Sequence, residues 1–334
     1  MSARSAAAPR DIHAEVTASI IAAIEANPGT PQLPWLQSTQ PLRLPRNALT
    51  RNNYSGINIL ALWAAGFRRG YEHQIWASYR QWAQLGAQVR QGERGTAVAF
   101  YKAYEVEPNA DDPDDDGNRR VLKTSIVFNI CQVSGYAPPA AAPAPQARTI
   151  DPWQPLEPVE DFIATTGADI RHGGDQAYFH RKNDFIQMPD RTSFVGTETS
   201  TPLEAYYAVL FHELAHWTGA SSRLNRTFGE RFDDQAYAAE ELVAELGSAF
   251  MSAELNITPA PRADHAQYLA HWLKLLKSDN RAIFVAAAKA SEAVRYLQQG
   301  GSLNPDANAT ASKVDRPHSA PGHGGLAVTP SRGI

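Results

Sequence analysis

The sequence predicts an α+β fold in two parts: a small α+β domain, then a domain in which a short antiparallel or mixed sheet precedes several helices. Up to about residue 86 the apolar residues are spaced as in helices, and from 88 to 133 they alternate as in strands. A run of proline and alanine at 137–147 is typical of a linker. With 334 residues, the chain is long enough for two domains that each bury a core.

The composition excludes several classes of protein. The formal net charge of −4 excludes a uniformly basic protein. The single cysteine, Cys131, permits no disulfide within the chain and favours the reducing cytoplasm. No apolar run approaches the ~20 residues that span a membrane. The apolar stretch near the N-terminus is flanked by Glu15 and Glu25, so we expect an amphipathic helix there, not a signal peptide, and no membrane partner.

The first domain is expected at 11–136, after a flexible tail at 1–10. Asp11 is a suitable N-cap for its first helix, and Gly86 a suitable end for its third. Two strands are expected to pair as a hairpin across the turn at 91–95, before an acidic loop and a further strand. The expected elements are helices at 11–27, 57–67 and 78–85, hairpin strands at 88–90 and 96–106, and a strand at 121–133.

The second domain is expected at 153–299, after a linker at 137–152 and before a disordered tail at 300–334. We interpret 184–189 as an edge strand beside a cleft, where an extended peptide could add to the sheet. The expected elements are a helix at 158–166, strands at 169–171, 177–180 and 184–188, and helices at 203–217, 233–255, 263–277 and 280–298.

The pattern His-Glu-Leu-Ala-His at 212–216 is the strongest functional signal in the chain. In a helix, His212 and His216 share one face, with Glu213 beside them. This HExxH pattern is typical of zinc metallopeptidases. Apolar and aromatic residues flank it almost all round, so a surface helix with two solvated histidines is less favoured than a buried site whose imidazoles need a metal ion as partner.

A third metal ligand is expected on the next long helix, where Glu241 and Glu245 are four residues apart between apolar neighbours. We interpret Glu241 as the ligand and Glu245 as the acceptor that orients a ligating histidine, although the reverse assignment stays open. Glu240 fits a solvated acidic face. Glu213 would be the general base that takes a proton from metal-bound water and delivers it to a leaving amine. Tyr268 is a candidate for a further electrophilic group, which would stabilise the oxyanion formed when the carbonyl is attacked.

The first half of the chain is basic and aromatic. Between residues 43 and 102 it has nine arginine or lysine residues against two glutamates. Nine tyrosine, tryptophan and phenylalanine residues are interleaved with them, and Tyr104 follows directly after. Cations that follow phosphates and rings that stack on bases are what single-stranded nucleic acid requires. At least half of these rings, Trp63 and Phe67 first, are expected instead to form the core of the domain.

Several segments together resemble the ArdC-type antirestriction proteins, whose N-terminal domain is similar to one in TraC-type plasmid primases. The resemblance covers about residues 11–298. It rests on residues 45–47, 54–58, 92–95, 98–102, 184–189, 217–219 and 240–247, together with Trp76, Gln81, Gly86, Val89, Arg223, Leu224 and the HExxH motif.

The resemblance implies a domain that binds single-stranded DNA, joined to a zincin-like metallopeptidase domain and encoded on mobile elements. It also implies that the protein shelters incoming plasmid DNA from host restriction during conjugation. The metal positions carry over as His212, His216 and Glu241, with Glu213 as the catalytic glutamate. We expect Zn²⁺, or another divalent transition metal such as Mn²⁺ or Co²⁺. The candidate DNA-contact residues are Arg43, Arg46, Asn47, Arg51, Tyr54, Asn58, Trp76, Arg80, Gln81, Arg90, Arg94 and Lys102.

Two other functions stay open at this point. The chain could be a regulatory metalloprotease whose first domain binds a protein partner, with no direct role in DNA binding. It could also use the metal only as a structural staple, although such sites are usually closed by a fourth side chain. The expected partners are single-stranded DNA and a possible protein substrate in the recipient cell, such as the restriction machinery or its regulator.

Overall fold

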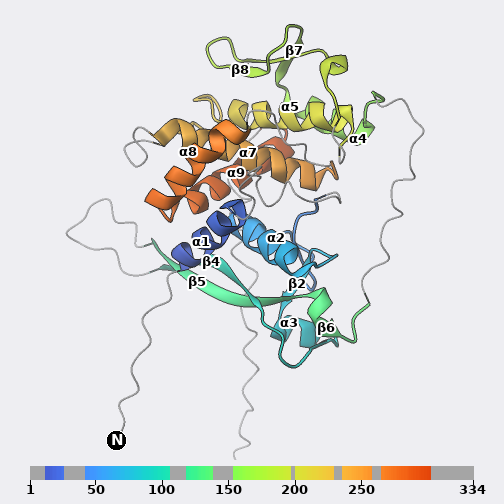
Figure 1. The fold of residues 1–334 in the computed structure, drawn as a ribbon, viewed down its shortest axis with the longest axis vertical. Coiled ribbons are helices and arrows are strands. Elements are labelled where there is room, and N and C mark those ends of the chain that lie inside the picture. Colours follow the sequence, from blue (N-terminus) through green and yellow to red (C-terminus); the bar gives the residue numbers. More distant parts are fainter. Residues whose placement is uncertain are drawn as a thin grey trace, which may run out of the picture. The chain divides into compact units, whose positions relative to one another are not determined.

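The computed structural model describes residues 12–25, 42–105, 118–137, 153–196, 200–228, 235–257 and 265–301 (Figure 1). The expected tail at 1–10, the acidic loop at 111–117, and nearly all of the expected linker and of the expected tail at 300–334 lie outside these ranges. Nearly all of the described residues belong to one compact unit, and only 102–105 and 118–121 belong to a second. None of the described helices is long and apolar enough to cross a membrane.

The described part of the first half mixes three helices with six short or medium strands, as the α+β prediction requires. Its helices are α1 (Ile12–Glu25), α2 (Ile57–Arg69) and α3 (Tyr79–Gln84). Its strands are β1 (Arg46–Asn47), β2 (Ile75–Ser78), β3 (Gln88–Val89), β4 (Thr96–Glu105), β5 (Asn118–Asn129) and β6 (Val133–Ser134), with a 3-10 helix, η2, at Ile130–Gln132.

The second half consists of a small three-stranded sheet, which packs against α5, and a set of helices. Its strands are β7 (Asp169–His172), β8 (Tyr178–His180) and β9 (Phe185–Met188). Its helices are α4 (Glu157–Thr166), α5 (Pro202–Thr218), α7 (Ala236–Glu254), α8 (His265–Ser278) and α9 (Ala282–Gln298), with a 3-10 helix, η3, at Arg191–Ser193. The α+β fold class is thus confirmed, and each predicted helix is present within a few residues of its expected limits.

The hairpin predicted between 88–90 and 96–106 is wrong. β3 pairs antiparallel with β6, as a separate two-stranded sheet. The backbone N–H of Arg90 donates to Gln132 O (3.0 Å), which continues this pairing past β3. β4 instead lies at the end of a four-stranded sheet in the order β1-β2-β5-β4. The turn at 91–95 therefore connects two sheets and does not close one hairpin.

The prediction that 184–189 is an edge strand is also wrong. β9 is the middle strand of its sheet, parallel to β7 on one side and antiparallel to β8 on the other. Three of its four side chains are correspondingly buried, with Ile186 and Met188 at 0% exposure. Because both backbone edges of β9 are already paired, an added peptide strand could bind only at β7 or β8.

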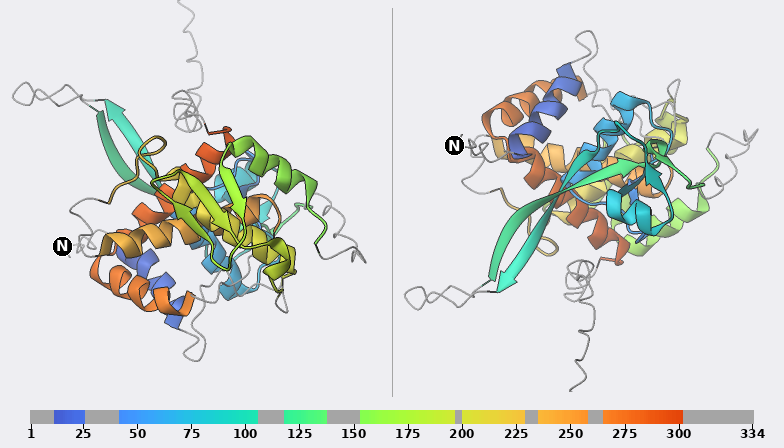
Figure 2. Two further views of the ribbon diagram at one scale, coloured as in Figure 1. Left: turned by 90° about the horizontal axis from the view of Figure 1, so that it is seen from above. Right: turned by 90° about the horizontal axis from the view of Figure 1, so that it is seen from below.

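The described residues of the two halves share one hydrophobic core, which includes α2 from the first half and α5, α7 and α9 from the second. Trp63 on α2 is fully buried and packs edge-on against Phe250 of α7, with ring centroids 5.8 Å apart. The backbone N–H of Gly56, before α2, donates to Ser291 Oγ on α9 (2.8 Å). α1 lies beside α8 (Figure 2), where Lys277 forms an ion pair with Glu25. The domain limits drawn from the sequence stay a prediction.

Candidate metal centre

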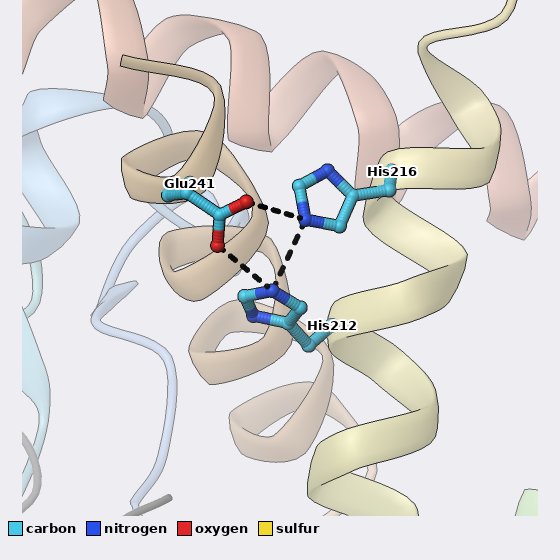
Figure 3. Close-up of side chains that lie close together, drawn as sticks. All are labelled: His212, His216 and Glu241. Carbon is cyan, nitrogen blue, oxygen red and sulfur yellow. Dashed lines mark hydrogen bonds and ion pairs between the residues drawn. The ribbon is translucent and has the colours of Figure 1, made fainter. Parts of the chain in front are cut away.

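Helix α5 carries the two histidines, and its start is fixed by its sequence. Thr201 and Glu204 form a capping box, in which Thr201 Oγ1 accepts from the Glu204 N–H and the Glu204 carboxylate accepts from the Thr201 N–H. Pro202 occupies the first turn, where a missing N–H has no cost. From that start, His212 and His216 emerge on the side of α5 that faces α7 (Figure 3).

Helix α7 approaches α5 closely because small residues lie at the crossing. A Cβ added at Gly247 would be 2.9 Å from the Ala215 Cβ. Ser248 Oγ donates to the Ala208 carbonyl (2.7 Å), which also joins the two helices. At this spacing the Glu241 carboxylate reaches both imidazoles across the interface.

Three side chains converge at one point between the helices (Figure 3). The two Nε2 atoms of His212 and His216 are 3.1 Å apart. The Glu241 carboxylate oxygens lie 3.5 Å from His212 Nε2 and 3.4 Å from His216 Nε2. Ligand atoms at about 2.0–2.2 Å from a tetrahedral ion are roughly 3.3–3.6 Å from one another. The three groups therefore have the spacing that a metal ion with an N, N, O ligand set needs.

The opposite nitrogens of both imidazoles face carboxylates, which sets the chemistry of the inner nitrogens. His216 Nδ1 is 3.1 Å from Glu240 Oε1, and His212 Nδ1 is 3.7 Å from Glu245 Oε2. A carboxylate accepts from the N–H of a neutral imidazole, so it leaves the lone pair on Nε2. Two such lone pairs at 3.1 Å repel unless a cation or a proton lies between them. The residues present thus fit a divalent metal ion.

Glu240 and Arg226 form a buried support that was not predicted from the sequence. Arg226, 5% exposed, donates to both carboxylate oxygens of Glu240 (2.8 and 2.7 Å) and to Ala215 O (2.7 Å). At Gly219 an added Cβ would be 2.7 Å from the guanidinium, so the glycine lets Arg226 cross the end of α5. Glu240 was interpreted as solvated, but its side chain is only 13% exposed. The sequence signal for a buried Glu240 was its position next to Glu241 on a helix expected to be buried.

These contacts shift the pKa values of the groups in the metal-free protein. Burial alone lowers the pKa of His216, but hydrogen bonds with Glu240 and Glu241 and the charge of Glu213 outweigh burial and raise that pKa to about 9. Burial raises the pKa of Glu240, yet hydrogen bonds with Arg226 and His216 bring it to about 2. Burial likewise opposes ionisation of Glu241, but contacts with both histidines hold its pKa far below its usual range.

The other predicted site residues differ in what the structure shows of them. Glu213 is buried, 4% exposed, on the same helix as the histidines. Glu245, also 4% exposed, lies on the Nδ1 side of His212 and not among the converging atoms. This placement favours Glu241 over Glu245 as the ligand. Tyr268 belongs to α8, and its side chain lies outside the described part of the structure.

The predicted DNA-contact residues fall into two groups. The first group is exposed and consists of Arg43, Arg46, Arg51, Arg80, Arg90 and Arg94. The second group is used inside the protein. Asn47 donates to Tyr54 Oη and Gln81 Oε1, and Asn58 exchanges two hydrogen bonds with the Ala99 backbone. Trp76 is 0% exposed, so its ring is part of the core and is closed to a stacking base. The Lys102 side chain lies outside the described residues.

Two family models match the chain, one for each half. Residues 10–128 match the N-terminal domain of anti-restriction factor ArdC. Residues 157–289, which include the converging histidines and Glu241, match the zincin-like metallopeptidase family.

Relatives of known sequence align with most of the chain. An uncharacterised protein, y4eC of Sinorhizobium fredii (strain NBRC 101917 / NGR234), is 43% identical over 294 residues, which cover 86% of this chain and 92% of that protein. The DNA primase TraC of Escherichia coli is 34% identical over 299 residues, 85% of this chain but only 26% of the primase.

Solved structures of one protein are similar over nearly their whole length. The metal-free crystal structure of the antirestriction protein ArdC from plasmid R388 is 36% identical, with a TM-score of 0.71, and the match covers 87% of this chain and 98% of that one. Its Mn(II)-bound structure is 35% identical, with a TM-score of 0.68, over 88% and 99% of the two chains.

Proposed function

Because this chain belongs to the ArdC family of antirestriction proteins, we propose that it binds single-stranded DNA and carries a working metallopeptidase site. In this function it protects incoming plasmid DNA from host restriction during conjugation, in the cytoplasm of the recipient. The observation that carries the enzymatic part is the convergence of two Nε2 atoms and a carboxylate at the spacing of metal ligands.

The proposed ligands are His212, His216 and Glu241, and the ion is Zn²⁺ or another divalent transition metal such as Mn²⁺, which the R388 relative binds. When bound, the ion supplies the Lewis acid that polarises a carbonyl and acidifies water. Three protein ligands leave one position open, which is typical of catalytic and not structural sites.

The remaining site residues orient ligands and move protons. Glu240, fixed by Arg226, holds the outer nitrogen of His216, so that the inner nitrogen keeps a lone pair for the metal. Glu245 lies 3.7 Å from the outer nitrogen of His212, where its charge favours the same tautomer without a hydrogen bond in the metal-free protein. Glu213 is the proposed general base, which accepts a proton from water and passes it to the leaving amine. Its buried position beside the ligands keeps competing solvent away from that transfer.

DNA binding is proposed for the first half, through its exposed arginines. Arg43, Arg46 and Arg51 lie on the segment before α2, and Arg80 and Arg94 lie around α3 and the following turn. These side chains can follow a phosphate backbone without reading a sequence. Four other predicted contact residues would act indirectly, because their hydrogen bonds fix the backbone that carries these arginines: Asn47, Tyr54, Asn58 and Gln81.

Metal analysis separates ligands from the base. We expect Glu213→Ala to retain a stoichiometric divalent ion and to lose any peptidase activity, whereas His216→Ala should lose the ion as well. A Glu213→Ala protein that binds no metal, or one that still cleaves a protein substrate, would contradict the assignment.

Gel shifts with single strands and duplexes of equal length test the DNA half. We expect a complex with the single strand at low salt that weakens steeply as salt rises, because phosphate contacts release counterions. The protein binding no single strand at low salt would refute this half. Cleavage of a host protein without any DNA complex would favour the alternative function as a regulatory metalloprotease.

A further inference from the structure

An open groove of about 490 Å³ lies on the first half of the chain, away from the metal centre in sequence. It forms where α3 and the β3–β6 sheet meet the end of β5. The residues that line it are Tyr79, Gln88, Val89, Arg90, Gln91, Glu93, Phe128 and Ser134. Its volume falls within the range of about 300–1,000 Å³ that small-molecule sites occupy.

An exposed aromatic ring forms one wall of this groove. Tyr79 is 53% exposed, whereas Trp63, Trp76 and Trp82 among the described residues of the same half are fully buried. Its phenol oxygen accepts a hydrogen bond from Gln88 Nε2 (2.7 Å). The ring is thus held in one orientation while a face remains open to solvent, and such a fixed ring loses little entropy when a planar group stacks on it.

The charge of the groove favours a neutral occupant over a phosphate. Arg90 is the cation in its lining, and its guanidinium donates to Glu93 (2.7 Å) and to the backbone oxygens of Cys131 and Val133. Arg90 is therefore compensated and immobilised. The exposed arginines Arg80 and Arg94 lie next to the lining residues in sequence, where they can meet the phosphates on either side of an occupant.

We propose that this groove is a nucleobase subsite in which Tyr79 stacks on one unpaired base of a single strand. The inference rests on the proposed DNA binding and names a residue that carries it. A base in a duplex is already stacked on both faces, so the groove selects for single strands without reading their sequence. The amide groups of Gln88 and Gln91 supply donors and acceptors for the base edge.

The test is fluorescence anisotropy of the full chain with a labelled strand of about 20 nucleotides, at several salt concentrations. Stacking of one base is worth about 1–3 kcal/mol, so we expect Tyr79→Ala to weaken binding by about 5- to 150-fold. The salt dependence should not change, because no phosphate contact is lost. Tyr79→Phe keeps the ring and should retain most of the affinity. Tyr178→Ala, which removes a ring of similar exposure (41%) on β8, is the matched control and should bind like wild type.

A strand with abasic positions distinguishes stacking from other effects of the substitution. Wild type should bind it more weakly than the intact strand, and Tyr79→Ala should bind both equally. Wild-type affinity in Tyr79→Ala, or a loss of affinity equal for intact and abasic strands, overturns the subsite while the proposed function stands. If wild type binds no single strand at all, the proposed DNA binding itself fails, and the subsite with it.

Discussion

Replacing Glu240 by glutamine isolates the contribution of the buried Arg226–Glu240 pair to metal binding. Glutamine keeps an oxygen that can accept from His216 Nδ1, 3.1 Å away in wild type, but it removes the negative charge. The imidazole then becomes a weaker donor to the ion. Loss of such an outer partner typically costs 10–100-fold in metal affinity, or about 1.4–2.7 kcal/mol.

Stability should change as well, for a separate reason. The Arg226 side chain is 1% exposed and would be left without its counter-charge. Breaking one partner of a buried pair costs about 3–5 kcal/mol, and we expect the low end because Glu240 retains some exposure. The double variant Arg226→Met/Glu240→Gln removes both charges. It should recover most of the free energy of unfolding but none of the metal affinity.

Competition with a chromogenic chelator gives the dissociation constant, and urea unfolding of the metal-free protein gives the stability. Glu254→Gln is the control, because this exposed residue lies at the far end of the same helix. A Glu240→Gln protein that binds metal within twofold of wild type would refute the reasoning. Recovery of metal affinity in the double variant would refute it equally, since affinity would then follow stability alone.

Three further outcomes are expected. Metal binding should release close to one proton, because the ion displaces the proton that His216 holds with a pKa of about 9. The metal affinity should therefore rise about tenfold per pH unit from pH 6 to 8 and level off above about pH 9. Calorimetry in buffers of different ionisation enthalpy measures the number of protons released. Gly247→Ala should lower the free energy of unfolding in urea by about 1–3 kcal/mol and weaken metal binding, because its Cβ would be 2.9 Å from the Ala215 Cβ. Gly66→Ala is the control: its Cβ would meet only the movable end of the Gln74 side chain, so its effect on stability should be small. Trp63→Ala should cost about 3–5 kcal/mol and lower a single thermal transition; a loss confined to an early, separate transition would show that the halves unfold independently.

The helices of the metal centre were predictable because their signals are local. A capping residue, the four-residue spacing of the histidines and flanking apolar side chains define α5 without reference to the rest of the chain. The choice between Glu241 and Glu245 could not be made this way. It depends on how α7 crosses α5, which Gly247 and Ala215 decide. Glu240 was misjudged for the same reason, since the arginine that buries it comes from a loop after α5.

Strand pairing was the least predictable part of the fold. β3 was assigned to its neighbour in sequence, but its partner β6 follows more than forty residues later. β9 was predicted to be an edge strand, but the sequence of a single strand does not determine its position in the sheet. Its apolar residues Phe185, Ile186 and Met188 did carry a signal, because a strand that is paired on both sides and buried on both faces needs few polar side chains. Trp76 shows the same limit for aromatic residues, whose exposure depends on what covers them.

The seating of Trp63 against Phe250 has a practical consequence for dissecting this protein. A fragment that ends before the second half would expose Trp63 and the core isoleucines of α2 to solvent. The complementary fragment would expose the apolar side chains of α7 and α9 that belong to the same core. Either fragment would tend to aggregate or unfold for reasons unrelated to DNA binding or peptide hydrolysis. Single side-chain replacements in the whole polypeptide are therefore the sound way to assign each activity to its half.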